Sequence, residues 1–307
     1  MGTFSSQILD LSVLNDLLSS HKTQKEVELF HTKTDLQQYL LAQSEKIGFV
    51  PTMGALHAGH LSLIKEAKNS NSLVVCSVFV NPTQFNDSKD LERYPRNLEK
   101  DVELLKTGHC DVLFAPSVEE IYPKDEKSNL VLLNLRGFDT IMEGQFRPGH
   151  FQGVVQVVSK LFEIVKPNNA YFGKKDFQQL EIIRLLAQEK FSKIDIHGCE
   201  TIREANGLAM SSRNALLSEE EKKKAALFYE VLMESKKLYK KLSPTELNSH
   251  VIKRFENKPS IKLDYFELIN RKTLTPVSDN HEKPEHITAC IAGFVGTTRL
   301  IDNMSIN

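Results

Sequence analysis

Residues 51–64 read PTMGALHAGHLSLI, and this stretch decides the fold that the sequence predicts. The run KIGFVPT (46–52) is typical of a buried strand, and LSLIKEAKN (61–69) has the spacing of an amphipathic helix. We therefore predict a strand that ends at Pro51, a turn that contains glycine, and a helix that begins near Gly59. The backbone N–H groups and the dipole of such a helix start form an anion site.

Strands and helices alternate on both sides of this turn. Further strands are predicted at 27–31, 72–80, 111–116, 169–173 and 194–202. Further helices are predicted from Thr34 (with Gln37 as its capping-box partner), around 96–107, and at 154–165 and 176–190. The nearly continuous apolar run at 72–80 suits a parallel strand covered on both faces. This order predicts an α/β fold with a doubly wound parallel sheet.

The character of the sequence changes after about residue 200. Ser218 and Glu221 form a capping box for a long helix over 219–242, and Ser243 with Pro244 begins a second helix. Strands at 261–270 and 286–295 follow, which predicts a smaller α+β domain. Three segments result: an N-terminal extension (1–26), a nucleotide- and acid-binding domain (27–201) and a C-terminal lid (202–307). The extension carries four apolar residues at helical spacing: Ile8, Leu11, Leu14 and Leu18.

Composition excludes several classes of function. The formal net charge of −1 gives no global field toward nucleic acid or an anionic membrane, and neither partner is expected. No apolar stretch approaches the roughly 20 residues that a membrane-spanning helix needs. The four cysteines form no CxxC pair and are spread along the chain, so we expect a reduced, cytoplasmic protein.

His57 and His60 are three residues apart at the predicted helix start. Two imidazoles at this spacing can face one bound phosphate and stabilise charge that develops there. Two unrelated surface histidines would show the same bare spacing, and only the strand–turn–helix context favours the functional interpretation. The sequence has no GxxxxGK[ST] and no GxGxxG after the first strand, so neither a P-loop nor a dinucleotide site is supported.

Three other polar segments follow predicted strands. In VNPTQFN (80–86), Asn81 and Gln84 are uncharged hydrogen-bonding groups suited to a carboxylate or hydroxyl, although a simple Asn-Pro turn is the alternative. In FGKKDFQQL (172–180), Lys175 suits a phosphate, although lysines at a helix start are usually solvated. In REANGLAMSSRN (203–214), two serines and Arg213 could close over a nucleotide, or could belong to a polar linker.

Together these motifs resemble the pantothenate synthetase family, the pantoate–β-alanine ligases. The resemblance runs from about Val27 to Asn303 and rests on PTMGALHAGHLSLI, VNPTQF, DLERYPR, FRPGHFQGV, YFGKKDFQQL, GLAMSSRN and RLIDN. It implies a Rossmann-like N-terminal domain, a smaller C-terminal lid and a homodimer. It also implies that pantoate and ATP give pantoyl adenylate and pyrophosphate, and that β-alanine then gives pantothenate and AMP.

The resemblance also implies roles for individual residues. His60 would be the proton donor, and His57, Lys175 and Arg213 would be further catalytic groups. Gln84 and Gln179 would hold pantoate, Gln84 would also face β-alanine, and Asp101 would lie near Mg²⁺. The residues that would contact ATP are Met53, Gly54, Ala55, Leu56, His57, Ala58, Gly59, His60, Gly173, Lys174, Lys175, Asp176, Ile202, Met210, Ser211, Ser212 and Arg213.

Two positions depart from the family pattern. Ala58 stands where an acidic residue is usual, and Thr83 replaces a common methionine. Two alternatives stay open: an adenylyltransferase that makes a dinucleotide, and a nucleotide-binding protein without catalysis. The products formed from ATP and pantoate would separate the three.

Overall fold

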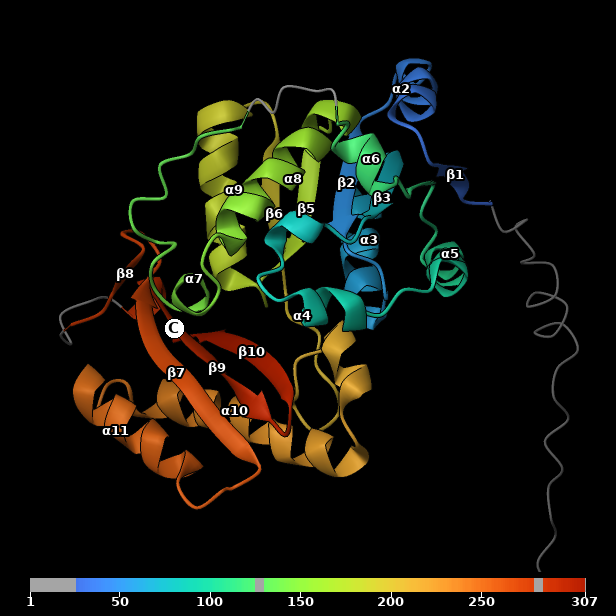
Figure 1. Ribbon diagram of the computed structural model, residues 1–307. Helices are drawn as coiled ribbons and strands as arrows, with labels where there is room; N and C mark the ends of the chain where they lie inside the picture. The colour runs from blue at the N-terminus through green and yellow to red at the C-terminus, as the bar shows by residue number, and fades with distance from the viewer. Residues whose placement is uncertain (1–25, 125–129, 279–283, 307) are drawn as a thin grey trace, which may run out of the picture.

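The computed structural model describes residues 26–124, 130–278 and 284–306. The helical spacing of Ile8, Leu11, Leu14 and Leu18 lies wholly outside these ranges. Two sheets organise the described chain, a six-stranded parallel sheet and a four-stranded antiparallel one. Figure 1 shows the parallel sheet with its helices above the antiparallel sheet, which is coloured orange to red.

The parallel sheet has the strand order β1-β4-β3-β2-β5-β6. Its strands are β1 (Glu28–Phe30), β2 (Ile47–Thr52), β3 (Leu73–Val78), β4 (Val112–Phe114), β5 (Asn169–Gly173) and β6 (Asp195–Cys199). From β2 the chain winds outward through β3 to β4, then returns to add β5 and β6 on the other side of β2. The winding direction therefore reverses between β2 and β5, where ligands bind in doubly wound sheets.

Alternate residues of the strands pack into separate clusters on the two faces of this sheet. Phe49, Val75 and Phe172 belong to one cluster, while their chain neighbours Val50 and Cys76 belong to the other. The helices of this region are α2 (Lys33–Leu41), α3 (Ala58–Ser70), α4 (Ser88–Arg93), α5 (Leu98–Thr107), α6 (Val118–Ile121), α7 (Glu143–Phe146), α8 (His150–Val165) and α9 (Phe177–Lys190). Coverage of both faces explains the continuous apolar strands of the sequence.

The second sheet has the order β10-β9-β7-β8 and is antiparallel. It consists of β7 (Ile261–Asn270), β8 (Thr275–Pro276), β9 (Ile287–Val295) and β10 (Thr298–Ser305). Two helices, α10 (Glu219–Leu238) and α11 (Pro244–Phe255), share a core with it. Short 3₁₀ turns occur at η1 (Pro82–Gln84), η2 (Ser212–Leu216) and η3 (Pro284–His286). The α/β fold with a smaller α+β unit is therefore confirmed.

The capping predictions had mixed outcomes. The capping box at Ser218 and the helix start at Ser243 are confirmed, and each serine accepts the backbone N–H three residues later. The predicted start at Thr34 was wrong, because the hydroxyl of Thr32 accepts the Asp35 N–H and α2 begins at Lys33. Both threonines precede the same apolar run, so the local pattern did not separate them. None of the described helices is both long enough and apolar enough to cross a membrane.

Candidate active site

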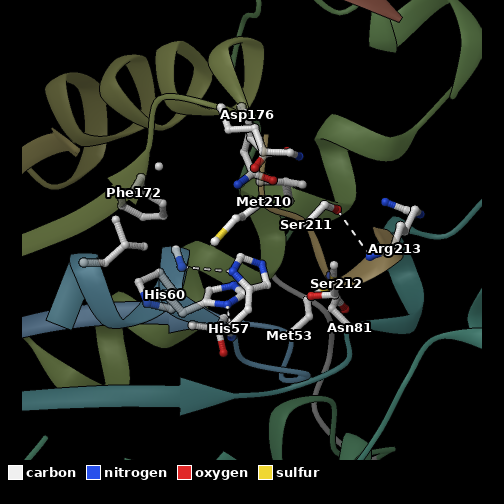
Figure 2. A pocket seen from close by; sticks show the side chains of 18 of the residues that line it. Met53, His57, His60, Asn81, Phe172, Asp176, Met210, Ser211, Ser212 and Arg213 are labelled. Atoms are coloured by element: carbon white, nitrogen blue, oxygen red, sulfur yellow. Dashed lines mark hydrogen bonds and ion pairs between the residues drawn. The ribbon is translucent and has the colours of Figure 1, made fainter. Parts of the chain in front are cut away.

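A cavity of about 210 Å³ opens at the carboxyl ends of β2, β3 and β5. Segments that follow four parallel strands meet there: residues 53–60 after β2, 81–84 after β3, 173–179 after β5 and 200–213 after β6. Figure 2 shows His57 and His60 together on one side, with Met210 and Asp176 across from them. The cavity therefore lies where the winding direction of the sheet reverses, as the topology predicts.

His57 and His60 form the helix cap at the start of α3. The Nδ1 atom of His57 accepts the Gly59 N–H at 3.1 Å, and the Nδ1 atom of His60 accepts the His57 N–H at 3.2 Å. A Cβ at Gly59 would lie 2.8 Å from Cε1 of His57, so glycine lets the ring close on the backbone. The two ring centroids are 4.1 Å apart, and both rings line the cavity.

These hydrogen bonds decide which ring nitrogen carries the proton. A backbone N–H can only donate, so each Nδ1 is unprotonated and a neutral ring carries its proton on Nε2. Burial, and then the Lys175 charge, lowers the pKa of His57 to about 4. Burial, the neighbouring His57 and Lys175 lower the pKa of His60 to about 3. Near neutral pH both side chains are therefore neutral Nε2–H donors.

The turn between β2 and α3 is held by Asp101 on α5. One carboxylate oxygen accepts the Leu56 N–H at 2.7 Å and the other accepts the Ala55 N–H at 3.1 Å. Gly54 and Ala55 have φ values of +79° and +50°, a backbone region that only glycine adopts easily. The carboxylate thus stabilises the strained turn by accepting hydrogen bonds from two of the turn's backbone N–H groups.

Gln84 lies in η1 and is buried. Its Oε1 accepts from Asn81 Nδ2 at 3.1 Å, and its Nε2 lies 3.2 Å from the Met53 sulfur. Asn81 Oδ1 in turn accepts from the hydroxyls of Thr83 and Tyr122, at 2.9 Å each. Thr83 therefore helps to fix Asn81.

The segment after β5 carries Lys175, Asp176 and Gln179 to the cavity wall. Lys175 Nζ lies 3.7 Å from an Asp176 oxygen, and its side chain is 17% exposed. Lys174 instead pairs with Glu200 and does not itself line the cavity. The two adjacent lysines therefore differ in role, and only Lys175 is available to a ligand in this cavity.

The junction segment, residues 203–214, lies directly on the histidine turn. Ser212 Oγ donates to the Ala55 carbonyl at 3.0 Å. Arg213 Nη2 pairs with Asp90 on α4 at 3.0 Å, and its backbone N–H donates to Ser211 Oγ (Figure 2). This segment is therefore packed against the first domain and closes one side of the cavity.

Most predicted site residues line this cavity. Those that do are Met53, His57, Gly59, His60, Gln84, Gly173, Lys175, Asp176, Gln179, Ile202, Met210, Ser211, Ser212 and Arg213. Gly54, Ala55, Leu56, Ala58, Lys174 and Asp101 do not line it. Gly54 and Asp101 instead line another cavity, which shares Met53 and Phe79 with the first.

Three functional candidates were missed by the sequence analysis, although two of them belong to the motif FRPGHFQGV. Glu143, Arg147 and His150 line a second cavity of about 80 Å³, which shares Gln84, Lys175 and Gln179 with the first. His150 Nδ1 donates to the Gln84 carbonyl at 2.8 Å, and Arg147 Nη2 donates to it at 3.3 Å. Burial and then Arg147 lower the pKa of His150 to about 4.

The expected magnesium ligand does not face the site. Both Asp101 oxygens accept backbone N–H groups and the residue is 3% exposed, so this carboxylate does not fit direct contact with a metal at the phosphates. Among the described residues, no group of three or more His, Cys, Asp or Glu could hold a metal ion. Mg²⁺ usually takes one or two carboxylates plus substrate phosphates, and Asp176 is the carboxylate that fits on this wall.

Comparison with known proteins agrees with this site. The family model described as pantoate-beta-alanine ligase matches residues 28–305. Pantothenate synthetase from Bacteroides fragilis is 48% identical over 281 residues, covering 91% of this chain and 98% of that protein. The enzyme of the same name from Flavobacterium psychrophilum is 48% identical over 282 residues, covering 91% and 99%.

Solved structures give the same result. Pantothenate synthetase from Thermus thermophilus superposes with a TM-score of 0.85 at 40% identity, covering 91% of this chain and 99% of that one. Pantoate-beta-alanine ligase from Francisella tularensis, complexed with beta-gamma ATP and beta-alanine, gives a TM-score of 0.75 at 36% identity, covering 91% and 98%. By family model, by sequence and by fold, the chain belongs to the pantoate–β-alanine ligase family, whose members are C–N bond-forming ligases.

Proposed function

We propose that this protein condenses (R)-pantoate with β-alanine at the expense of ATP, through a pantoyl-adenylate intermediate. One observation carries the proposal: the groups that can donate hydrogen bonds to phosphate oxygens line the same cavity as the buried amide of Gln84. In the first step a pantoate carboxylate oxygen attacks the α-phosphorus, and the bond to pyrophosphate breaks. In the second step the amine nitrogen attacks the acyl carbon, loses a proton, and AMP leaves.

The charges of the cavity support ATP as the activating substrate. Lys175 and Arg213 supply positive charge, and His57 and His60 supply neutral Nε2–H donors. Donors fixed in position before the reaction stabilise charge that develops on phosphate oxygens. We assign the histidines this role, and not proton transfer, because burial lowers the pKa of each to about 4 or below.

The second cavity supports the order of the substrates. Gln84 and Gln179 lie on the wall shared by both cavities, which suits pantoate between ATP and the amine. Arg147 lines the second cavity but not the first, and is a cation for the β-alanine carboxylate. Mg²⁺ would neutralise the phosphates and would be held by their oxygens with Asp176.

Two product measurements test the proposal. Mass detection should find pantothenate and AMP after the protein is mixed with ATP, Mg²⁺, pantoate and β-alanine. Isotope exchange between ATP and pyrophosphate should require pantoate but not β-alanine. Exchange that depends strictly on β-alanine would contradict the two-step route, and a stable dinucleotide product would favour an adenylyltransferase instead.

Assembly and compartment stay predictions. The resemblance implies a homodimer, which light scattering can test. Cys76, Cys110, Cys199 and Cys290 are all free and buried, which supports the expected reducing cytoplasm.

A further inference from the structure

The motif RLIDN, near the C-terminus, occupies most of β10 and faces the segment after β5. The proposed reaction assigns it no role. Its last two residues, Asp302 and Asn303, line the second cavity beside Lys175. The antiparallel sheet therefore contributes a wall to the site of the parallel sheet.

The side chain of Asn303 binds the backbone of both lysines after β5. Its Nδ2 donates to the Lys174 carbonyl at 2.9 Å and to the Lys175 carbonyl at 2.7 Å. One carboxamide thus uses both of its N–H bonds on adjacent carbonyls. These two hydrogen bonds cross between the sheets over about 128 residues of sequence, so no local interaction can replace them.

Asn303 is itself held by a buried ion pair. Asp302 is 5% exposed, and Arg203 contacts its two oxygens at 2.6 and 3.0 Å. The Asp302 Oδ1 atom also accepts the Asn303 backbone N–H at 2.8 Å. Arg203 stacks over the Tyr229 ring at 4.5 Å. The asparagine is therefore fixed before any ligand arrives.

Lys175 needs such support, because its ammonium group has few constraints of its own. Its Nζ pairs with Asp176 only at 3.7 Å, and the residue lines both the first and the second cavity. When a flexible side chain can reach more than one cavity, the position of its backbone decides where its charged end lies. Holding both carbonyls fixes where the Lys175 side chain begins.

We propose that Asn303 is a positioning residue that aims Lys175 at the phosphates, an inference that rests on the proposed function. It acts through the backbone of residues 174 and 175, to whose carbonyls its side-chain amide donates. The C-terminal domain would then contribute to adenylation through a fixed strand, in addition to any movement of the junction segment.

A double-mutant cycle tests this dependence on Lys175. In the native background, Asn303→Ala should lower kcat/KM for ATP about tenfold in radiometric pyrophosphate exchange, while KM for pantoate stays within twofold. In a Lys175→Ala background the same substitution should lower kcat/KM for ATP less than twofold, because the ammonium group that Asn303 positions is gone. Equal losses in the two backgrounds, or no loss in the native one, would overturn the proposal.

Two further variants guard against a general loss of structure. Asn303→Asp has nearly the same shape, but its carboxylate faces two carbonyl oxygens; its kcat/KM should recover as pH falls and the acid becomes a donor. Asn248→Ala is the matched control, since Asn248 donates to the Phe266 carbonyl within the second domain and should leave kcat/KM unchanged. An Asn303→Asp profile parallel to the native one would also count against the proposal.

The experiment separates this inference from the proposed function. If the native protein shows no pantoate-dependent exchange, the proposed function has failed. The double-mutant cycle is then repeated by calorimetry, which measures the affinity of each variant for a non-hydrolysable ATP analogue. The expected coupling between Asn303 and Lys175 is the same. If exchange is normal but the losses are additive, only the positioning role has failed.

Discussion

His60 Nδ1 accepts the backbone N–H of His57 at 3.2 Å, so the second histidine holds the backbone of the first. His57 does the same for Gly59. Each ring thereby uses one nitrogen to build the turn and leaves the other for a ligand. A substitution at either position removes two functions at once, and the two can be separated by choosing which nitrogen is replaced.

We predict that His60→Ala lowers kcat by about two orders of magnitude or more, the scale of losing one oxyanion donor. His60→Asn places an amide oxygen near the Nδ1 position and should keep the turn, yet lose the same activity. His60→Gln places an amide N–H near Nε2 and should recover part of it. Steady-state rates and circular dichroism check these outcomes, and near-native kcat in a folded His60→Asn protein would contradict them.

The buried histidines also predict how stability depends on pH. His57, His60 and His150 have folded pKa values of about 4, 3 and 4, below the ordinary 6.5. Between pH 6.5 and about 4 the unfolded chain binds more protons than the folded one, so the free energy of unfolding falls as pH falls. At pH 5 each histidine should lower the free energy of unfolding by roughly 2 kcal/mol relative to pH 7.

Urea unfolding at pH 7 and pH 5 measures this loss, and His150→Asn isolates one contribution. His150 is 5% exposed, and its Nδ1–H bond to the Gln84 carbonyl can be replaced by an asparagine amide. Between pH 7 and pH 5, the free energy of unfolding of this variant should fall by about 2 kcal/mol less than that of the native protein. Equal losses in the two proteins would show that His150 titrates alike in the folded and unfolded states.

The Arg213–Asp90 pair predicts competition between a carboxylate and ATP. Arg213 is partly exposed and pairs with Asp90 at 3.0 Å. Arg213→Ala should weaken ATP binding and slow adenylation, and Arg213→Lys should rescue only partly because lysine lacks the planar fork. Asp90→Asn, which releases the arginine, should bind ATP as tightly as the native protein or more tightly.

Limited proteolysis gives an independent test of closure by this segment. ATP should protect residues 203–214 in the native protein and much less in Arg213→Ala. If ATP leaves cleavage there unchanged in the native protein, the segment is a fixed wall of the cavity. The hydrogen bond from Ser212 to the Ala55 carbonyl would then be enough to keep it in place.

The sequence predicted most of the parallel sheet because its strands are apolar on both faces, a pattern that local sequence carries. It did not predict β10, whose inward-facing positions are Thr298, Leu300 and Asp302. The buried aspartate breaks the apolar alternation, and its partner Arg203 lies 99 residues earlier. A strand stabilised by so distant an ion pair has no local signal.

The same limit applies to the site. The histidine, glutamine and lysine segments each follow a strand, so the doubly wound topology alone brings them together. Arg147 and His150 reach the site through hydrogen bonds to Gln84 across 63 and 66 residues, and spacing within FRPGHF does not reveal that contact. Likewise the family resemblance implied that Asp101 lies near Mg²⁺, but its hydrogen bonds to the turn are visible only in the structure.

Asp101 provides a test of whether its carboxylate serves the turn or a metal. Asp101→Asn keeps the size of the side chain but turns one oxygen into an N–H₂ group that faces a backbone N–H of Ala55 or Leu56. One buried donor is then unsatisfied, so the free energy of unfolding should fall by about 1–3 kcal/mol. The displaced turn should lower kcat, while the Mg²⁺ concentration for half-maximal rate stays within twofold.

Asp176→Asn should do the opposite, raising that Mg²⁺ concentration with little change in stability, because Asp176 is half-exposed on the cavity wall. A large shift in the Mg²⁺ requirement for Asp101→Asn without loss of stability would restore Asp101 as the metal ligand.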